Sequence, residues 1–378
     1  MKKSLLALAL MGAFSSAAMA QSSVTIYGIA DIGLQNLKNG SPAGATTKLS
    51  SGQVQGSRLG FKGVEDLGDG LKAHFDLVMG FNLDEGSSGQ GGRTFGRRSV
   101  VGLTGDFGVI ELGRDKTINN LFIDAFDPFY SGFINSGNGL SNLYFFGGTA
   151  NVAGAASTAN SAGRVGNAIF YYTPNWGGFR GSATYGFGEA AGSNTPGSSY
   201  GITLRYTNFG LDIAYSYSKD NNQLGTVAPV NGINFSNTIN ARSANTFAVS
   251  YDIDTPAGKL TPVFIYEKQK DENRLAPRLD QQNYSIGGTL KFDGSNSLLA
   301  TWTKIVDDTR RTPTAALPAT TVGDARQWAL GFQHNLSKRT DLYIAYAKTN
   351  QDATSRKVAA VVAGADVTEF TLGIRHKF

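Results

Sequence analysis

The sequence lacks cysteine altogether and has only three histidines among its 378 residues. The absence of cysteine excludes a disulfide framework and any thiolate site. The histidines, His74, His334 and His376, are widely separated, and none accompanies a serine placed by a catalytic motif. Acid–base catalysis and metal binding both need several groups close together. We therefore expect no enzyme activity, no catalytic residue, no metal and no cofactor.

Long apolar runs are also missing once the first residues are set aside, the longest being Val358 to Ala365. A membrane-crossing helix needs about twenty apolar residues, so no such helix is expected. A strong excess of one charge is missing as well. The chain carries 34 basic and 29 acidic residues, and without Lys2 and Lys3 the net charge of +5 falls to +3. A nucleic-acid-binding protein would show a clear basic excess, so no nucleic-acid partner is expected.

Residues 1–20 have the pattern of an export signal. Lys2 and Lys3 form its charged start, residues 5–14 its apolar core, and Ala18-Met19-Ala20 its small-residue cleavage site. We expect cleavage after Ala20, which leaves 378 − 20 = 358 residues, numbered 21–378. That length suits either one large barrel domain or two ordinary domains.

Alternation of apolar and polar side chains is what the mature chain has in abundance, in about sixteen segments of about ten residues. Leu71, Phe75 and Met79 share one face of such a segment, and Lys72 and Asp76 share the other. Short connections rich in Gly, Pro, Asn or Asp alternate with longer ones, as in transmembrane barrels. We predict an all-β fold, a sixteen-stranded antiparallel transmembrane β-barrel. A soluble sandwich is the alternative, and no repeating blade motif indicates a propeller.

Aromatic residues recur near the ends of the apolar faces, among them Tyr217, Trp302 and Trp328. Such rings favour the boundary between lipid and water, although the core of a soluble fold could also hold them. The final segment alternates up to the terminal Phe378. We expect it to pair with the first segment, residues 24–34, because a closed sheet leaves no unpaired backbone in hydrocarbon.

One stretch, Asp115 to Gly163, breaks this alternation for about fifty residues, whereas connections are usually about 4–6 residues long. It is too apolar to remain in water. Its apolar residues include Leu121, Phe122, Ile123, Phe126, Phe129, Tyr130, Phe133, Tyr144, Phe145 and Phe146. We predict that residues 115–163 fold into the barrel and narrow it as a constriction loop.

Six stretches carry a family pattern in a fixed order along the whole mature chain. They are Ser23–Asp31, Gly56–Gly68, Arg97–Leu103, Leu112–Arg114, Gly163–Asn167 and the terminal Phe378. With this order and spacing, the chain resembles the general porins of Gram-negative bacteria, most closely the beta-proteobacterial kind. The resemblance implies a sixteen-stranded homotrimer in the outer membrane, surrounded by lipid and lipopolysaccharide, with its third external loop folded inward. Phe378 looks like the signal by which the barrel-assembly machinery recognises its substrates.

The resemblance also implies a set of residues at the constriction. The basic wall would be Arg58, Lys62, Arg97 and Arg164, and the opposing acids Asp124 and Asp127, with Asp115 a weaker candidate. Arg58 and Lys62 are four residues apart in a strand, so they share a face, and the apolar Leu59 and Phe61 occupy the other. Arg97 shares its face with Ser99 and Val101, so its place in the pore depends on the resemblance. Each of these charges could instead be a solvated wall residue or could anchor the loop.

A channel of this kind needs a water-filled path, a constriction and a fixed field, and no catalyst. The resemblance therefore implies a general diffusion porin, a passive channel for ions and small hydrophilic solutes. Because the predicted basic residues outnumber the acidic ones, we expect a mild preference for anions. The alternatives are a solute-selective porin and a barrel that acts mainly as a surface adhesin or structural protein.

Overall fold

The computed structural model describes residues 23–130, 163–188, 197–222, 240–271, 280–308, 323–352 and 364–378. The predicted export signal and residues 131–162 of the predicted loop lie outside these ranges. No helix within the described ranges is long and apolar enough to cross a bilayer.

Strands make up most of the described chain. The long strands are β1 (Ser23–Lys38), β3 (Arg58–Gly68), β4 (Leu71–Asn82), β6 (Arg98–Gly105), β7 (Gly108–Lys116), β8 (Arg164–Tyr172), β9 (Phe179–Gly186), β10 (Ser199–Asn208), β11 (Leu211–Asn222), β12 (Asn240–Tyr251), β14 (Gly258–Asp271), β15 (Asp280–Phe292), β16 (Asn296–Asp307), β17 (Ala325–Asn335), β18 (Thr340–Gln351) and β19 (Val367–Lys377). The short elements are β2 (Thr46–Ser51), β5 (Ser87–Ser88), β13 (Ile253–Thr255), the α-helix α2 (Ile118–Phe126) and a 3-10 turn at Gln90–Gly92.

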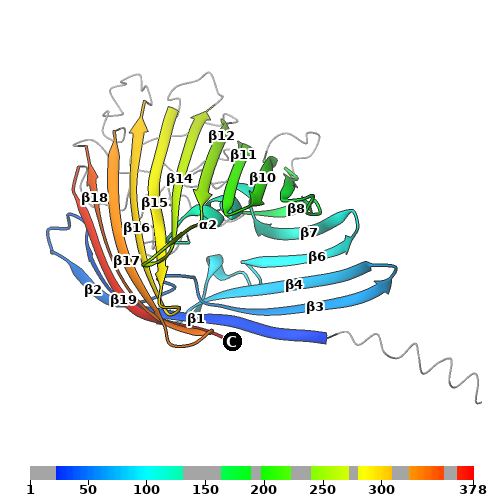
Figure 1. The fold of residues 1–378 in the computed structure, drawn as a ribbon, viewed down its shortest axis with the longest axis horizontal. Coiled ribbons are helices and arrows are strands. Elements are labelled where there is room, and N and C mark those ends of the chain that lie inside the picture. Colours follow the sequence, from blue (N-terminus) through cyan, green and yellow to red (C-terminus); the bar gives the residue numbers. More distant parts are fainter. Residues whose placement is uncertain are drawn as a thin grey trace, which may run out of the picture.

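The strands form one antiparallel sheet that closes on itself. Each long strand pairs with its neighbour in the chain, and β1 also pairs with β19, residues Ile29–Lys38 against Thr368–Lys377. Without the three short pieces β2, β5 and β13, the wall has 19 − 3 = 16 strands. The prediction of a closed sixteen-stranded antiparallel barrel is therefore confirmed, as is the pairing of the last strand with the first (Figure 1).

Side chains alternate between the two faces of this wall. In β18, Tyr343 and Ala345 are buried, while Ile344 and Tyr346 between and beside them are exposed. The exposed set is largely apolar, with Leu330 at 56% relative exposure, while the buried set is rich in Gln, Thr, Ser, Asp and Glu. An apolar outer face and a polar inner face are typical of a barrel in lipid.

Aromatic rings of neighbouring strands contact one another on the outer face. The ring centroids of Trp328 and Tyr346 are 5.3 Å apart, and Trp302 lies directly opposite Trp328 in the register of β16 and β17. Such a row is compatible with the predicted place of these rings at the lipid–water boundary. In β8, whose two faces the sequence leaves equally apolar, Phe170 is buried on the inner side, and Ile169 is 39% exposed.

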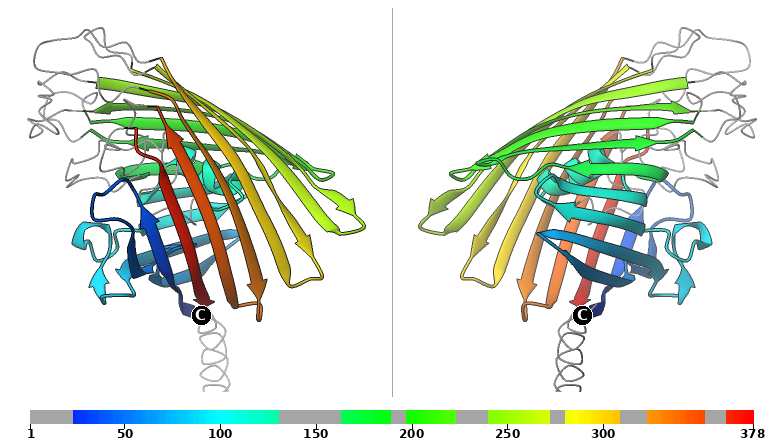
Figure 2. Two further views of the ribbon diagram at one scale, coloured as in Figure 1. Left: turned by 90° about the vertical axis from the view of Figure 1, so that its left-hand side faces the viewer. Right: turned by 90° about the vertical axis from the view of Figure 1, so that its right-hand side faces the viewer.

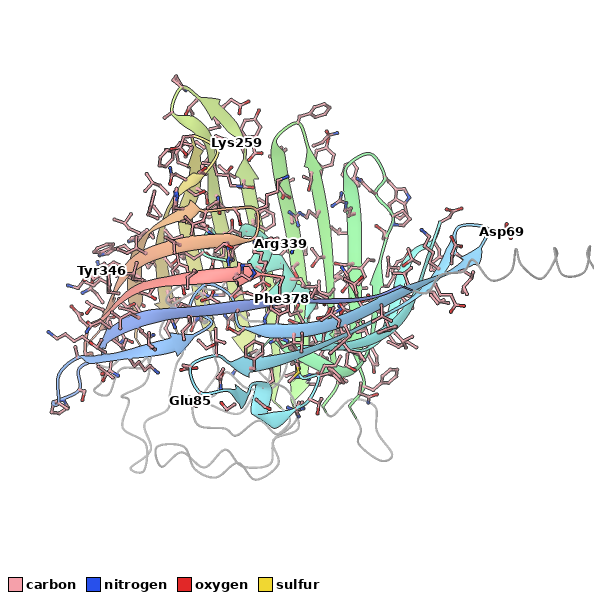
Figure 3. The ribbon with its side chains drawn as sticks, turned by 90° about the horizontal axis from the view of Figure 1, so that it is seen from below. Asp69, Glu85, Lys259, Arg339, Tyr346 and Phe378 are labelled. Atoms are coloured by element: carbon pink, nitrogen blue, oxygen red, sulfur yellow. The ribbon has the colours of Figure 1, made fainter. Side chains whose placement is uncertain are left out.

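Tight turns close one rim of the barrel. In the β3–β4 turn both central residues, Asp69 and Gly70, have positive φ, and this conformation matches the twist of a hairpin. Figure 3 labels Asp69, Lys259 and Arg339 from three of these turns, and Glu85 from one of the longer connections at the opposite rim. Figure 2 shows that the strands are tilted, as closure of a barrel requires.

Candidate functional site

The helix α2 lies against the inner face of the wall. Thr117 caps its first turn, because the Thr117 hydroxyl oxygen accepts a hydrogen bond of 3.2 Å from the Asn120 N–H. Phe122, Ile123 and Phe126 on one side of the helix are buried against the wall. The wall side chains they contact are Ala214, Ala248, Val263 and Ile265, all on the inner faces of β11, β12 and β14. Residues 118–126 therefore occupy space inside the barrel (Figure 1).

A buried carboxylate adds a polar attachment for the same helix. Glu267 of β14 is fully buried, and its Oε2 accepts hydrogen bonds from the Asn119 side chain at 3.1 Å and the Thr246 hydroxyl at 2.9 Å. Its Oε1 accepts from the side chains of Gln269 at 2.6 Å and Asn283 at 3.0 Å. The helix α2 is thus joined to the wall by a polar contact in its first turn and by apolar contacts after it.

Beyond the helix the chain crosses to another part of the wall. The Asp127 carboxylate accepts a hydrogen bond of 3.0 Å from the Phe129 N–H, which fixes the turn after α2. The Phe129 ring lies over Gly331 of β17 and packs in a buried cluster with Val54. The described part of the long connection therefore contacts the inner wall at two separate places.

A group of guanidinium groups lies at the base of this connection. Arg58 Nε donates to the Gly56 carbonyl oxygen at 3.0 Å, and Arg164 Nε donates to the Arg97 carbonyl oxygen at 2.9 Å. Arg58, Arg97 and Arg164 lie close enough to repel one another, and Asp124 of α2 attracts all three. The same Asp124 carboxylate forms an ion pair with Lys116 at the end of β7.

The three arginines Arg58, Arg97 and Arg164, which we call the arginine cluster, form no ion pair with any carboxylate in the described part of the chain. Arg58 and Arg164 donate to backbone carbonyl oxygens, and Arg97 Nε has no hydrogen-bond partner among the described residues. The positive charge of the cluster is therefore balanced in the described structure only by the attraction of Asp124.

The structure brings together four of the six residues that the sequence placed at the constriction. Arg58, Arg97, Arg164 and Asp124 lie close together, as described above. Lys62 is on the inner face, but it is exposed and lies over the ring of Tyr27, 5.1 Å from its centroid. Asp127 is buried in the turn after α2.

Arg97 reaches the cluster because it lies outside the strand. The alternation of the sequence placed it on the face of Ser99 and Val101, and Val101 is 58% exposed on the outer side. The strand β6 begins only at Arg98, however, so the backbone before it is free of that alternation. The Arg97 guanidinium points into the space beside Gly56.

Comparison with known proteins supplies the family. The model of the Gram-negative porin family matches residues 7–354, which is most of the chain. The chain belongs to the Gram-negative porin family. It is accordingly a protein of the outer membrane, and its barrel is a passive channel for solutes.

Relatives of this porin cover its full length. An outer membrane porin protein of Bordetella pertussis is 31% identical over 421 residues, and outer membrane porin protein 32 of Delftia acidovorans is 32% identical over 394 residues; both alignments cover 100% of each chain. A solved anion-selective porin from Comamonas acidovorans has a TM-score of 0.74 and 28% identity, covering 95% of this chain and 100% of that one. OmpT of Vibrio cholerae, with a TM-score of 0.62 and 18% identity, shares the fold.

Sequence reasoning missed several charged residues of the porin wall. Arg98 is ion-paired with three carboxylates: Asp76 at 3.0 Å, Glu111 at 2.5 Å, and Asp115. Arg98 shares the inner face of β6 with Val100 and Gly102, and this alternation could have identified it. The family pattern instead pointed to its neighbour Arg97. Lys116 had no signal, because its partner is brought near only by the folding of α2.

The helix itself was also missed, although its sequence carries signals. Thr117 is a favourable N-cap residue, and the apolar residues from Ile118 to Phe126 follow helical spacing. Within the described ranges, no group of three or more His, Asp or Glu side chains is placed to hold a metal ion.

Proposed function

We propose that this porin is a general diffusion channel for ions and small hydrophilic solutes, with a mild preference for anions. The observation that carries the preference is the arginine cluster, whose members lack carboxylate partners among the described residues. With Lys116 there are four cations close to one acid, Asp124, so positive charges outnumber negative ones at this place. A ring of uncompensated positive charge lowers the energy of a passing anion and raises that of a cation.

The loop that carries Asp124 supplies the second half of the constriction. Residues 115–163 are our candidate constriction loop, and the packing of α2 and Phe129 on the inner wall supports this. Cations on the wall and an acid on the loop set up a transverse field. A polar solute can align with that field, while an apolar solute must displace ordered water. Lys62 and Asp127 contribute less in this proposal, because Lys62 lies over the Tyr27 ring and Asp127 accepts from the Phe129 N–H in the turn after α2.

Other features of the proposal follow from the family. The solved structure described as an anion-selective porin supports the same selectivity for this chain. We expect a homotrimer in contact with lipid and lipopolysaccharide, an export signal cleaved after Ala20 to leave the domain 21–378, and recognition of Phe378 by the barrel-assembly machinery. The porin family consists of channels, and we propose no enzyme activity.

Reversal potentials in planar bilayers under a salt gradient test the selectivity directly. The wild-type porin should prefer the anion at low salt. The preference should fade toward 1 M salt, because the Debye length falls from about 30 Å at 0.01 M to about 3 Å at 1 M. Arg97→Gln should reduce it, and Lys62→Gln should reduce it less. A clear cation preference in the wild type would refute the proposal.

Two further measurements separate the alternatives. Liposome swelling with uncharged sugars of graded size should show a cutoff that depends on size alone. A strong preference for one sugar would favour a solute-selective porin, and no permeation would favour an adhesin or structural barrel. Single-channel recordings that close in three equal steps would support the trimer.

A further inference from the structure

The wall of the barrel is interrupted between β2 and β3. Both strands pair with β1, with Ser51 opposite Ile32 and Arg58 opposite Ile29. Between these pairs, β1 contributes only residues 30 and 31, whereas the other side contributes residues 52–57. Six residues opposite two cannot stay in the plane of a sheet, so residues 52–57, which we call the inner bulge, leave the wall.

Asp31 of β1 holds the inner bulge in place. Its carboxylate accepts hydrogen bonds from three successive backbone N–H groups, those of Gln53 at 3.1 Å, Val54 at 3.0 Å and Gln55 at 2.8 Å. It also accepts from the Tyr343 hydroxyl at 2.7 Å, and Asp31 is fully buried. Bonds to an ionised carboxylate are stronger than bonds between neutral groups, so this side chain is the main anchor of the middle of the bulge. The two ends are held by the Asp31 carbonyl oxygen, which accepts from the Gly52 N–H at 2.8 Å and the Ser57 hydroxyl at 3.0 Å.

The bulge points into the barrel. Val54 at its centre is fully buried, and it packs with Phe129 of the candidate constriction loop and with inner-face side chains of β16, β17 and β18. Thr371 on the inner face of β19 donates a hydrogen bond of 3.1 Å to the Gln53 side-chain oxygen. The inner bulge therefore lies across the inner wall and reaches the far end of the described loop.

Two members of the arginine cluster rest on this bulge. The carbonyl oxygen of Gly56 accepts the hydrogen bond from Arg58 Nε. A Cβ atom added to Gly56 would lie 2.6 Å from Nη1 of Arg97, so the absence of a side chain there leaves the space that this guanidinium fills. The position of Gly56 thus determines where both guanidinium groups lie.

We infer that Asp31 is a positioning residue for ion selectivity. It bends residues 52–57 into the bore and so places Gly56 under Arg58 and Arg97. This inference rests on the proposed anion preference of the channel, and it adds a residue that does not face the passing ion.

The direction in which Asp31→Asn changes ion selectivity distinguishes a positioning role of Asp31 from a direct effect of its charge on the passing ion. Asp31→Asn removes a negative charge from the wall, which by itself should raise anion preference. The Asn side chain keeps only one acceptor oxygen. If that oxygen stays toward the N–H groups of Val54 and Gln55, the NH₂ group faces the Gln53 N–H, which loses its acceptor. This loss should instead loosen the bulge and let the guanidinium groups move away from the ion path. We expect the anion-to-cation permeability ratio to fall about sixfold, because moving one charge from about 4 Å to about 8 Å in water changes the permeability of each ion about 2.4-fold, in opposite directions. Open-channel current noise should rise.

A matched control removes one buried negative charge, as Asp31→Asn does, but makes no change at the inner bulge. Glu369 of β19 is another buried carboxylate of the inner wall, and the Gln35 side chain of β1 donates to it. Glu369→Gln should leave the permeability ratio unchanged or raise it, without added noise. If Asp31→Asn matches Glu369→Gln in ratio and noise, the inference is overturned.

A second variant works even if Asp31→Asn does not fold. In Gly56→Ala the added Cβ atom would contact only the guanidinium end of the flexible Arg97 side chain. The barrel should therefore form, with the Arg97 guanidinium displaced. We expect a lower permeability ratio and a changed conductance, and an unchanged channel would contradict the role given to the bulge. A wild-type channel without anion preference would refute the proposed function. In that case, the conductance and current noise of Asp31→Asn and Gly56→Ala, compared with the wild type, would show whether the inner bulge determines the width of the bore.

Discussion

Apolar packing, more than hydrogen bonding, should hold α2 on the wall, and two substitutions separate the contributions. Ile123 is fully buried among the inner-face side chains of β11, β12 and β14. Replacing Ile123 by Ala removes buried apolar atoms and leaves a cavity. We expect the free energy that holds α2 on the wall to fall by about 2–5 kcal/mol. A helix as short as α2 is marginal by itself, so its stability depends on this packing.

Glu267→Gln tests the polar contribution. The amide side chain of this variant could keep its oxygen toward Gln269 and Asn283, which donate to Oε1 in the wild type. Its NH₂ group would then face Asn119, which could flip, and Thr246, whose hydroxyl can accept as well as donate. Because the four contacts can be re-formed, we expect a cost of about 1 kcal/mol, which is the usual net value of one hydrogen bond.

Single-channel recording compares the two variants. If α2 narrows the bore, Ile123→Ala should raise the open-channel noise and shift the conductance, while Glu267→Gln should remain close to the wild type. Thermal unfolding of the barrel should change little in either variant, because α2 is not part of the closed sheet. Noise that is greater in Glu267→Gln than in Ile123→Ala would refute the reasoning and make the carboxylate the principal attachment.

The remaining predictions concern the stability of the wall. Arg98→Ala leaves the three carboxylates around it without their cation, and we expect a loss of about 3 kcal/mol or more in the free energy of unfolding. It would appear as a lower temperature for the heat-dependent mobility shift in detergent electrophoresis, and unchanged heat resistance would contradict it. Gly28→Ala places a Cβ 2.4 Å from the Phe378 ring and 2.5 Å from the Arg58 carbonyl oxygen of β3, so it should weaken the seam that joins β1 to both its neighbours in the same assay. The control Gly166→Ala, whose Cβ meets nothing closer than 3.5 Å, should not, and equal effects would disprove a seam-specific cause.

Much of the barrel could be predicted because it depends on local periodicity. A repeat of two residues puts lipid-facing and lumen-facing side chains on opposite faces, and tight turns have recognisable residues. For this reason the sheet, its closure between β1 and β19, and the inward faces of Arg58 and Lys62 follow from the sequence. The family pattern added Arg97, Arg164 and Asp124.

Periodicity fails at the ends of strands, and there the prediction was incomplete. Residues before the first residue of a strand do not follow its alternation, and the sequence pattern places that first residue only to within one or two positions. This is why Arg97 and Arg98 could not be sorted by pattern. The inner bulge could not be predicted either, because its six residues oppose two residues of β1 only after the sheet has formed.

The sequence by itself determined the class of the fold, the outer and inner faces of the strands, and most of the charges near the bore. Only the tertiary structure decided which charges meet. Lys116 contacts Asp124 after α2 has docked, and Asp31 reaches Tyr343 only once the sheet has closed. The physical reason is distance along the chain: period and turn chemistry act over a few residues, whereas Asp31 and Tyr343 are 312 residues apart.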